Sequence, residues 1–162
     1  MKLILACMAF WVCTAEGMRR SALLKQREQL LAELSAMLCG FAIEIRCTAP
    51  TLDELCGAAT GVFANLLREC KEGSRDIRET WENACGRLSA LPCSGREETS
   101  LLRELGASLG KSDAQGQLAL IELYRERLAQ CEKQASQELL QKGRLYRSLG
   151  VLCGLGAAVM VL

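Results

Sequence analysis

Two short apolar segments stand at the two ends of this chain, and each has basic residues on its inner side. Residues 3–15 are followed by Arg19, Arg20, Lys25 and Arg27, and residues 149–162 are preceded by Lys142, Arg144 and Arg147. Positive charge beside a membrane segment tends to stay in the cytoplasm. Both ends therefore predict the same arrangement, in which a polar middle lies in the cytoplasm and is anchored twice to one membrane.

Both apolar segments are shorter than the roughly 20 residues with which a helix crosses a bilayer. Tyr146 can lie at the level of the headgroups, and Arg144 and Arg147 can extend their charged ends to the membrane surface. We therefore predict three parts, namely an N-terminal membrane anchor over residues 1–18, a cytoplasmic helical bundle over residues 19–147 and a C-terminal membrane segment over residues 148–162.

A cleaved secretory signal is the alternative for the first segment, with cleavage after Cys13-Thr14-Ala15. Cleavage would export the polar middle and would reverse the expected charge placement at the second segment. The cysteines of the middle part are odd in number and lack paired spacing, unlike a disulfide scaffold. They are Cys39, Cys47, Cys56, Cys70, Cys85, Cys93 and Cys131. Free thiols of this kind are typical of a reducing compartment, which favours a retained anchor.

The composition narrows the possible chemistry. The chain contains no histidine, which removes Ser-His-Asp and Cys-His catalysis and histidine-ligated metals. No basic block interleaved with aromatic residues indicates nucleic acid binding. We therefore expect no catalytic residue, no cofactor, no metal and no nucleic acid partner. A membrane-anchored enzyme that uses a thiolate such as Cys93, beside Pro92, stays open as an alternative.

Helical periodicity dominates the middle of the chain, where Pro50 and Pro92 are the only prolines. Apolar side chains recur every three or four residues at Leu31, Leu34, Leu38, Phe41 and Ile45, and again at Leu120, Tyr124, Leu128, Cys131, Ala135 and Leu139. Capping boxes are predicted at Thr51/Glu54, Ser94/Glu97 and Ser112/Gln115. The sequence predicts an all-α antiparallel bundle of five to six helices, whose first and last helices extend into N- and C-terminal transmembrane segments.

Two glycine motifs have more than one interpretation. Gly106, Gly110, Lys111 and Ser112 are similar to the end of a phosphate-binding loop, but only three residues separate the glycines and a helix precedes them. A turn that ends one helix and caps the next is the favoured interpretation. Gly150 and Gly154 have GxxxG spacing, which would let the last segment pack closely on the first, although glycine is also simply common in membrane helices.

The stretch Leu105-Gly106-Ala107-Ser108-Leu109-Gly110-Lys111-Ser112-Asp113, with Gln117 after it, resembles the LGxxLGxSD…Q signature of the stage III sporulation protein AB family. The ending Tyr146-Arg147-Ser148-Leu149-Gly150-Val151-Leu152 is similar as well. The resemblance runs from end to end. It departs mildly in its many cysteines and in Thr80-Trp81, where the family often has Ala-Trp.

The resemblance implies a component of the stage III A complex that links mother cell and forespore, located in the membrane on the mother-cell side. It also implies a cytoplasmic helical domain like that of platform protein F in type II secretion and type IV pilus machines, although this chain has one such domain where those have two. The implied partners are the membrane, other stage III A proteins and a secretion-type ATPase. A platform of a secretion, competence or pilus system outside sporulation is the alternative.

The expected contacts with partners lie in two charged regions of the middle part, one around residues 111–113 and one on the Arg/Glu face near residues 68–78. We expect an ATPase contact at Lys111, Ser112 and Asp113, and a second on a charged face that includes Arg68, Arg75 and Arg78. A charged face that is merely solvated is the common alternative. Gly150 and Gly154 are the expected packing positions within the membrane.

Overall fold

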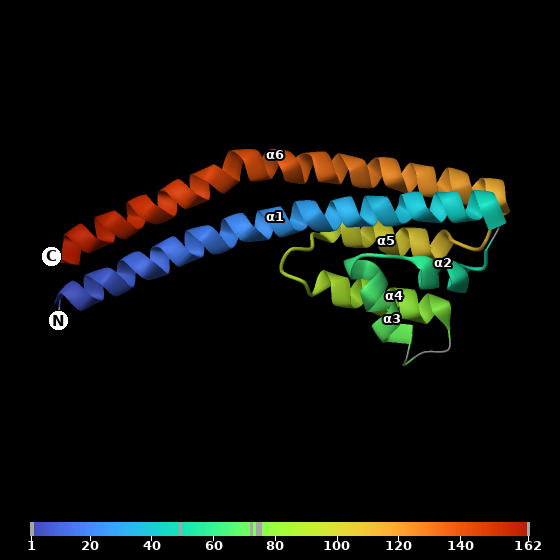
Figure 1. The fold of residues 1–162 in the computed structure, drawn as a ribbon, viewed down its shortest axis with the longest axis horizontal. Coiled ribbons are helices and arrows are strands. Elements are labelled where there is room, and N and C mark those ends of the chain that lie inside the picture. The colour runs from blue at the N-terminus through green and yellow to red at the C-terminus, as the bar shows by residue number, and fades with distance from the viewer. Residues whose placement is uncertain (1, 49, 72, 74–75, 162) are drawn as a thin grey trace. The chain divides into compact units, whose positions relative to one another are not determined.

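The computed structural model describes residues 2–48, 50–71, 73 and 76–161, and all of its regular structure is helical (Figure 1). The six helices of this part of the chain are α1 (Lys2–Thr48), α2 (Leu52–Ala58), α3 (Val62–Lys71), α4 (Ile77–Ser89), α5 (Arg96–Ser108) and α6 (Ala114–Val161). No strand is found among these residues. The prediction of an all-α bundle of five to six helices is confirmed in helix content and number.

Two compact units divide the chain. Unit 1 comprises Met1–Glu28 and Gln134–Leu162, and unit 2 comprises Gln29–Lys133. The long helices α1 and α6 each contribute to both units, whereas the short helices α2 to α5 belong to unit 2 alone. The first proline precedes α2, and the second lies between α4 and α5, where neither interrupts a helix.

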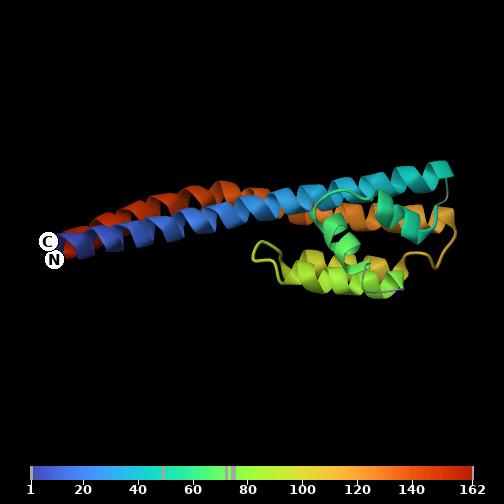
Figure 2. The ribbon, with the colours of Figure 1, turned by 60° about the horizontal axis from the view of Figure 1, so that its bottom comes forward.

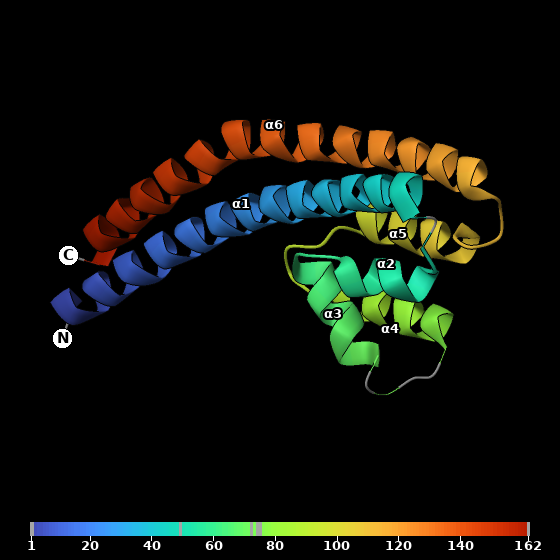
Figure 3. The same ribbon diagram turned by 45° about the vertical axis from the view of Figure 1, so that its right-hand side comes forward.

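The core of unit 2 contains the whole predicted apolar stripe of α1 and part of that of α6, because Leu120 is only half-buried and the last two positions of the α6 stripe belong to unit 1. Leu31, Leu38 and Phe41 of α1 are at most 2% exposed, and Leu128 of α6 is 1% exposed. The short helices lie together in this unit (Figure 3), and α4 packs against both α3 and α5. Phe63 of α3 meets Trp81 of α4 edge to face, with ring centroids 5.1 Å apart. These contacts hold α4 between its neighbours.

Capping explains where the short helices begin. The predicted box at Thr51 and Glu54 is confirmed, since each side chain accepts a hydrogen bond from the backbone of the other. The prediction at Ser94 and Glu97 is wrong by one residue. Gly95 N donates instead to the buried Glu98 carboxylate, at 2.5 Å. The Ser94 hydroxyl is engaged with Thr99, 3.2 Å away, so the helix begins after Gly95.

Unit 1 pairs the N-terminal part of α1 with the C-terminal part of α6, which lie side by side in every view (Figure 2). Arg27 of α1 lies 3.5 Å from Glu138 of α6, and Lys142 donates to the same carboxylate at 2.8 Å. The hydrogen bond from Lys142 lowers the pKa of Glu138. A Cβ added to Gly143 would lie 3.6 Å from the Ser21 hydroxyl, so small residues bring the helices close together here.

Among the described residues, none of the helices combines the length and the apolar sequence that a membrane span requires. Large apolar side chains are nevertheless exposed near both ends, among them Trp11 at 69% and Leu152 at 63%. Gly150 and Gly154 lie within α6, but their surroundings fall outside the described residues. Their predicted packing role therefore stays a prediction.

Two buried thiols make stability depend on pH. Burial, with a smaller effect of nearby Asp53 and Glu82, raises the pKa of Cys56 and of Cys85 to about 12. Because folding favours the neutral thiol, its contribution is complete below the unfolded pKa near 9 and is lost as the pH rises from 9 towards 12. We expect urea unfolding at pH 10 to show a loss of about 1 kcal/mol for each thiol relative to pH 8. A Cys85→Ala chain should lose correspondingly less between the same two pH values, and an unchanged loss would contradict the assignment.

Candidate partner-binding groove

The connection between α5 and α6 contains the glycine-rich motif, and most of the motif residues build the turn itself. Leu105 and Leu109 are fully buried, and Gly110 has a φ of +77°, a left-handed conformation that glycine adopts without strain. The Asp113 carboxylate accepts from Gly116 N at 3.0 Å, and the Gln117 amide donates to the Ser112 carbonyl at 3.0 Å. The interpretation as a helix-ending and helix-capping turn is confirmed, with Asp113 rather than Ser112 as the cap.

The first glycine of the motif has a different function, because it lies within α5 against the indole of Trp81. A Cβ added to Gly106 would overlap Cδ1 and Nε1 of that ring. The same Nε1 donates to the Leu102 carbonyl at 2.8 Å. Gly106 therefore provides the space in which the buried Trp81 satisfies its only polar group. A phosphate loop would need this backbone to be accessible, and here it is covered.

Removal of the cap at the start of α6 should have a measurable effect. We expect Asp113→Ala to lower the free energy of unfolding by about 1 kcal/mol, because the Gly116 N–H loses its acceptor at an N-terminus. Asp113→Asn keeps an oxygen acceptor and should stay within about 0.5 kcal/mol of the original chain. Chemical denaturation of the three chains gives the comparison. Equal losses for alanine and asparagine would show that the carboxylate charge, not the hydrogen bond, stabilises the turn.

The residues predicted to contact a partner differ in their location and in their bonds within the fold. Lys111, Ser112 and Asp113 are exposed together in the turn between α5 and α6. Arg68 is engaged within the fold, since it donates to the Ala59 carbonyl at the end of α2 and to Asn65. Arg78 is exposed in the first turn of α4. Arg75 lies outside the described residues. All three described cations of the predicted set, Arg68, Arg78 and Lys111, are thus exposed, and the Arg68 side chain is also bonded to the end of α2.

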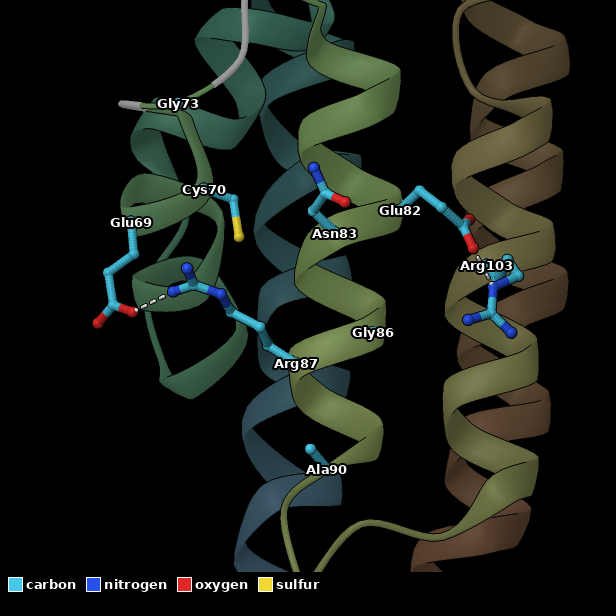
Figure 4. A pocket seen from close by; sticks show the side chains of 9 residues that line it. All are labelled: Glu69, Cys70, Gly73, Glu82, Asn83, Gly86, Arg87, Ala90 and Arg103. Carbon is cyan, nitrogen blue, oxygen red and sulfur yellow. Dashed lines mark hydrogen bonds and ion pairs between the residues drawn. The ribbon is translucent and has the colours of Figure 1, made fainter.

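A groove that was not predicted lies on the outer face of α4. This open groove of about 700 Å³ is bordered by α3 and α5 (Figure 4). The residues that line it are Glu69, Cys70, Gly73, Glu82, Asn83, Gly86, Arg87, Ala90 and Arg103. Three of them belong to the segment 68–78 that was expected to form a contact face. Arg68 and Arg78, the described cations expected on that face, are not among the residues that line the groove.

Ion pairs form the two borders of the groove, and small residues form its floor (Figure 4). Arg87 of α4 lies 2.9 Å from Glu69 of α3 on one side, and Glu82 of α4 lies 2.6 Å from Arg103 of α5 on the other. Asn83, Gly86 and Ala90 follow one another along the floor. Their spacing of three and four residues places them on one face of the helix, and this is the sequence signal that could have revealed the groove.

The described residues include no group of three or more metal-ligating side chains that could hold an ion. Cys93, the residue considered for a thiolate enzyme, is half-buried and lies outside the lining of the groove. The groove combines a concave surface with two ion pairs and the side-chain amide of Asn83. These features suit recognition of a protein surface.

Comparisons with known proteins identify the chain at the level of a family. The family model for stage III sporulation protein AB matches residues 2–162. No curated protein and no solved structure matches the chain. The match includes the turn from Leu105 to Gln117, whose geometry accounts for the residues that first suggested the resemblance. The chain therefore belongs to the stage III sporulation protein AB family.

Proposed function

We propose that this protein is a non-enzymatic membrane component of the stage III A sporulation complex that links mother cell and forespore. It acts there as a platform that couples a cytoplasmic secretion-type ATPase to the channel. The family match over residues 2–162 is the observation that carries this proposal. The same match favours the sporulation complex over a secretion, competence or pilus platform, which was the alternative function.

Membrane attachment is supported by the apolar sequence at both ends of unit 1. Exposed Met8, Trp11 and Val12 of α1 and exposed Leu149 and Leu152 of α6 are apolar side chains that water solvates poorly. The two helix ends lie side by side (Figure 2), as two segments that enter one membrane from the same face would. In this proposal residues 1–18 and 148–162 are the anchors, and residues 19–147 lie in the mother-cell cytoplasm.

Coupling is supported by helix continuity. The helices α1 and α6 each run without a break from unit 2 into unit 1. A helix is a stiff element, because each peptide group is hydrogen-bonded along its axis. A force applied to unit 2 would therefore be passed to the proposed anchors through two covalent connections. The platform itself then needs no catalytic residue, since the ATPase supplies the energy.

The proposed ATPase contact includes the exposed turn between α5 and α6. Lys111 is the favoured contact residue, because the turn depends on its neighbours and not on its side chain. Arg78 is the second exposed cation of the proposed contact. The partner surface should therefore carry carboxylates at this point.

Crosslinking and affinity capture from membranes of sporulating cells test this function. We expect the secretion-type ATPase and other stage III A proteins to be recovered with the full chain. Lys111→Glu should reduce recovery of the ATPase several-fold, whereas Lys133→Glu, the same charge reversal at another exposed lysine, should leave it unchanged. Absence of the ATPase from the captured material would contradict the coupling role. Equal effects of both variants would place the contact elsewhere.

Thiol labelling tests the proposed orientation separately. Cys39 and Cys47 of α1 are exposed and belong to unit 2. A maleimide that cannot cross membranes should label them only after the cells are permeabilised. A chain with both cysteines replaced by serine is the control for labelling elsewhere. Labelling of Cys39 or Cys47 in intact cells would reverse the orientation and remove the contact with a cytoplasmic ATPase.

A further inference from the structure

The outer face of α4 presents polar or small residues at the spacing of the a and d positions of a parallel two-stranded coiled coil. Asn83 and Gly86 of α4, with Ala90 immediately after its last residue, take the a, d and a positions, and the groove leaves all three exposed. Glu82 then falls at the preceding g position and Arg87 at the following e position. In parallel pairs, a g residue faces the e residue that lies five positions further along the other helix. The spacing thus places a carboxylate at one edge of the exposed face of α4 and a guanidinium at the other.

We propose that a second copy of this chain docks in the groove, with the two α4 helices parallel about a twofold axis. Glu82 of one copy then faces Arg87 of the second copy, and the symmetry repeats the pair on the other side. This surface is distinct from the proposed ATPase contact at Lys111, and the proposal does not depend on the platform function.

The walls of the groove support the same pairing. With a parallel twofold axis, the α5 side of one copy lies opposite the α3 side of the other. The α5 side presents Glu82 with Arg103, and the α3 side presents Arg87 with Glu69. Each edge of the interface therefore brings together two carboxylates and two guanidinium groups in alternating order. An antiparallel arrangement would bring Glu82 against Glu82 and Arg87 against Arg87, which like-charge repulsion disfavours.

The floor of the groove fits the approach of a second helix. Gly86 and Ala90 have little or no side chain, so two helix backbones can come close to each other without displacing core residues. Asn83 would meet Asn83 of the second copy, and an asparagine pair at an a position favours a parallel dimer in one register. Glu79 takes the d position that precedes Asn83, so the run of uncharged a and d positions ends there. The contact between the two helices therefore extends over a few turns only. We therefore expect a weak dimer, which forms at micromolar or higher concentrations.

A matched pair of glycine variants tests the interface. A Cβ at Gly86 or at Gly57 meets no atom within 4 Å, so both helical positions accept a side chain in the monomer. Gly86→Glu places two like charges at the proposed axis, whereas Gly57→Glu adds the same charge on α2, outside the groove. Sedimentation of the full chain in detergent should show a dissociation constant raised about tenfold or more by Gly86→Glu. Gly57→Glu should leave it within about twofold.

Charge exchange provides a second test that does not depend on a loss of binding. The Arg87→Glu chain and the Glu82→Arg chain should each be monomeric alone, because each carries like charges at both edges. Their mixture should form a heterodimer, in which the acidic side chains of the first variant face the arginines of the second. Salt should weaken this heterodimer, since the pairs are exposed.

Three results would overturn the proposal. The first is an original chain that stays monomeric at a concentration of about 0.5 mM. The second is a mixture of the two charge variants that fails to associate. The third is a dimer that Gly86→Glu leaves intact.

Discussion

Replacement of Gly106 by alanine is expected to lower the free energy of unfolding by about 2–4 kcal/mol, one of the two largest effects expected in unit 2. The added methyl group would overlap the Trp81 indole, which is 2% exposed and has no room to move outward. Displacement of the ring would also lengthen the hydrogen bond from its Nε1 to the Leu102 carbonyl. Together, these two losses exceed the roughly 1 kcal/mol by which alanine stabilises a helix relative to glycine.

Gly86→Ala is the matched control, because it makes the same change within a helix where nothing lies within 4 Å of the new methyl group. Here only helix propensity acts, and we expect a gain of about 0.5–1 kcal/mol. Urea unfolding followed by tryptophan fluorescence and by far-ultraviolet circular dichroism measures both variants. A Gly106→Ala chain as stable as the original would show that Trp81 can repack, and that the indole is not the reason for a glycine at this position.

The second large effect is expected at Leu109, the residue that follows α5. Its side chain is fully buried, although it lies in a connection that looks polar in sequence. We expect Leu109→Ala to lower the free energy of unfolding by about 3 kcal/mol, since the lost apolar contacts leave a cavity in a close-packed core. Urea unfolding of the original chain and of Leu109→Ala, followed by tryptophan fluorescence, measures this difference in the free energy of unfolding.

Lys111→Ala, two residues away in the same turn, separates the structural part of the motif from its exposed part. The lysine is exposed, so its removal should change the free energy of unfolding by less than about 0.5 kcal/mol. If Lys111→Ala destabilised the chain as much as Leu109→Ala, the lysine would belong to the structure of the turn. The proposed ATPase contact would then lose its main residue.

The position of the groove depends on packing between elements that are remote in sequence. The pairs Glu69–Arg87 and Glu82–Arg103 join residues 18 and 21 positions apart, and periodicity within one helix carries no information about such partners. The same holds for Arg68, which looks like part of a charged contact face but donates to the carbonyl that ends α2. The sequence predicts that the Arg68 side chain is exposed, but it does not reveal the hydrogen bond that this side chain donates.

The sequence by itself determined helix content, the buried stripe of α1, most of the stripe of α6 and the family, because these depend on local periodicity and on a contiguous motif. The cap at Thr51 followed from local chemistry in the same way. Tertiary structure alone decided that Gly106 must be glycine, since the reason is an indole 25 residues earlier in the chain. It also decided that Glu98 and not Glu97 caps α5, because Ser94 is engaged with Thr99 and the helix begins after Gly95, which lies three residues before Glu98.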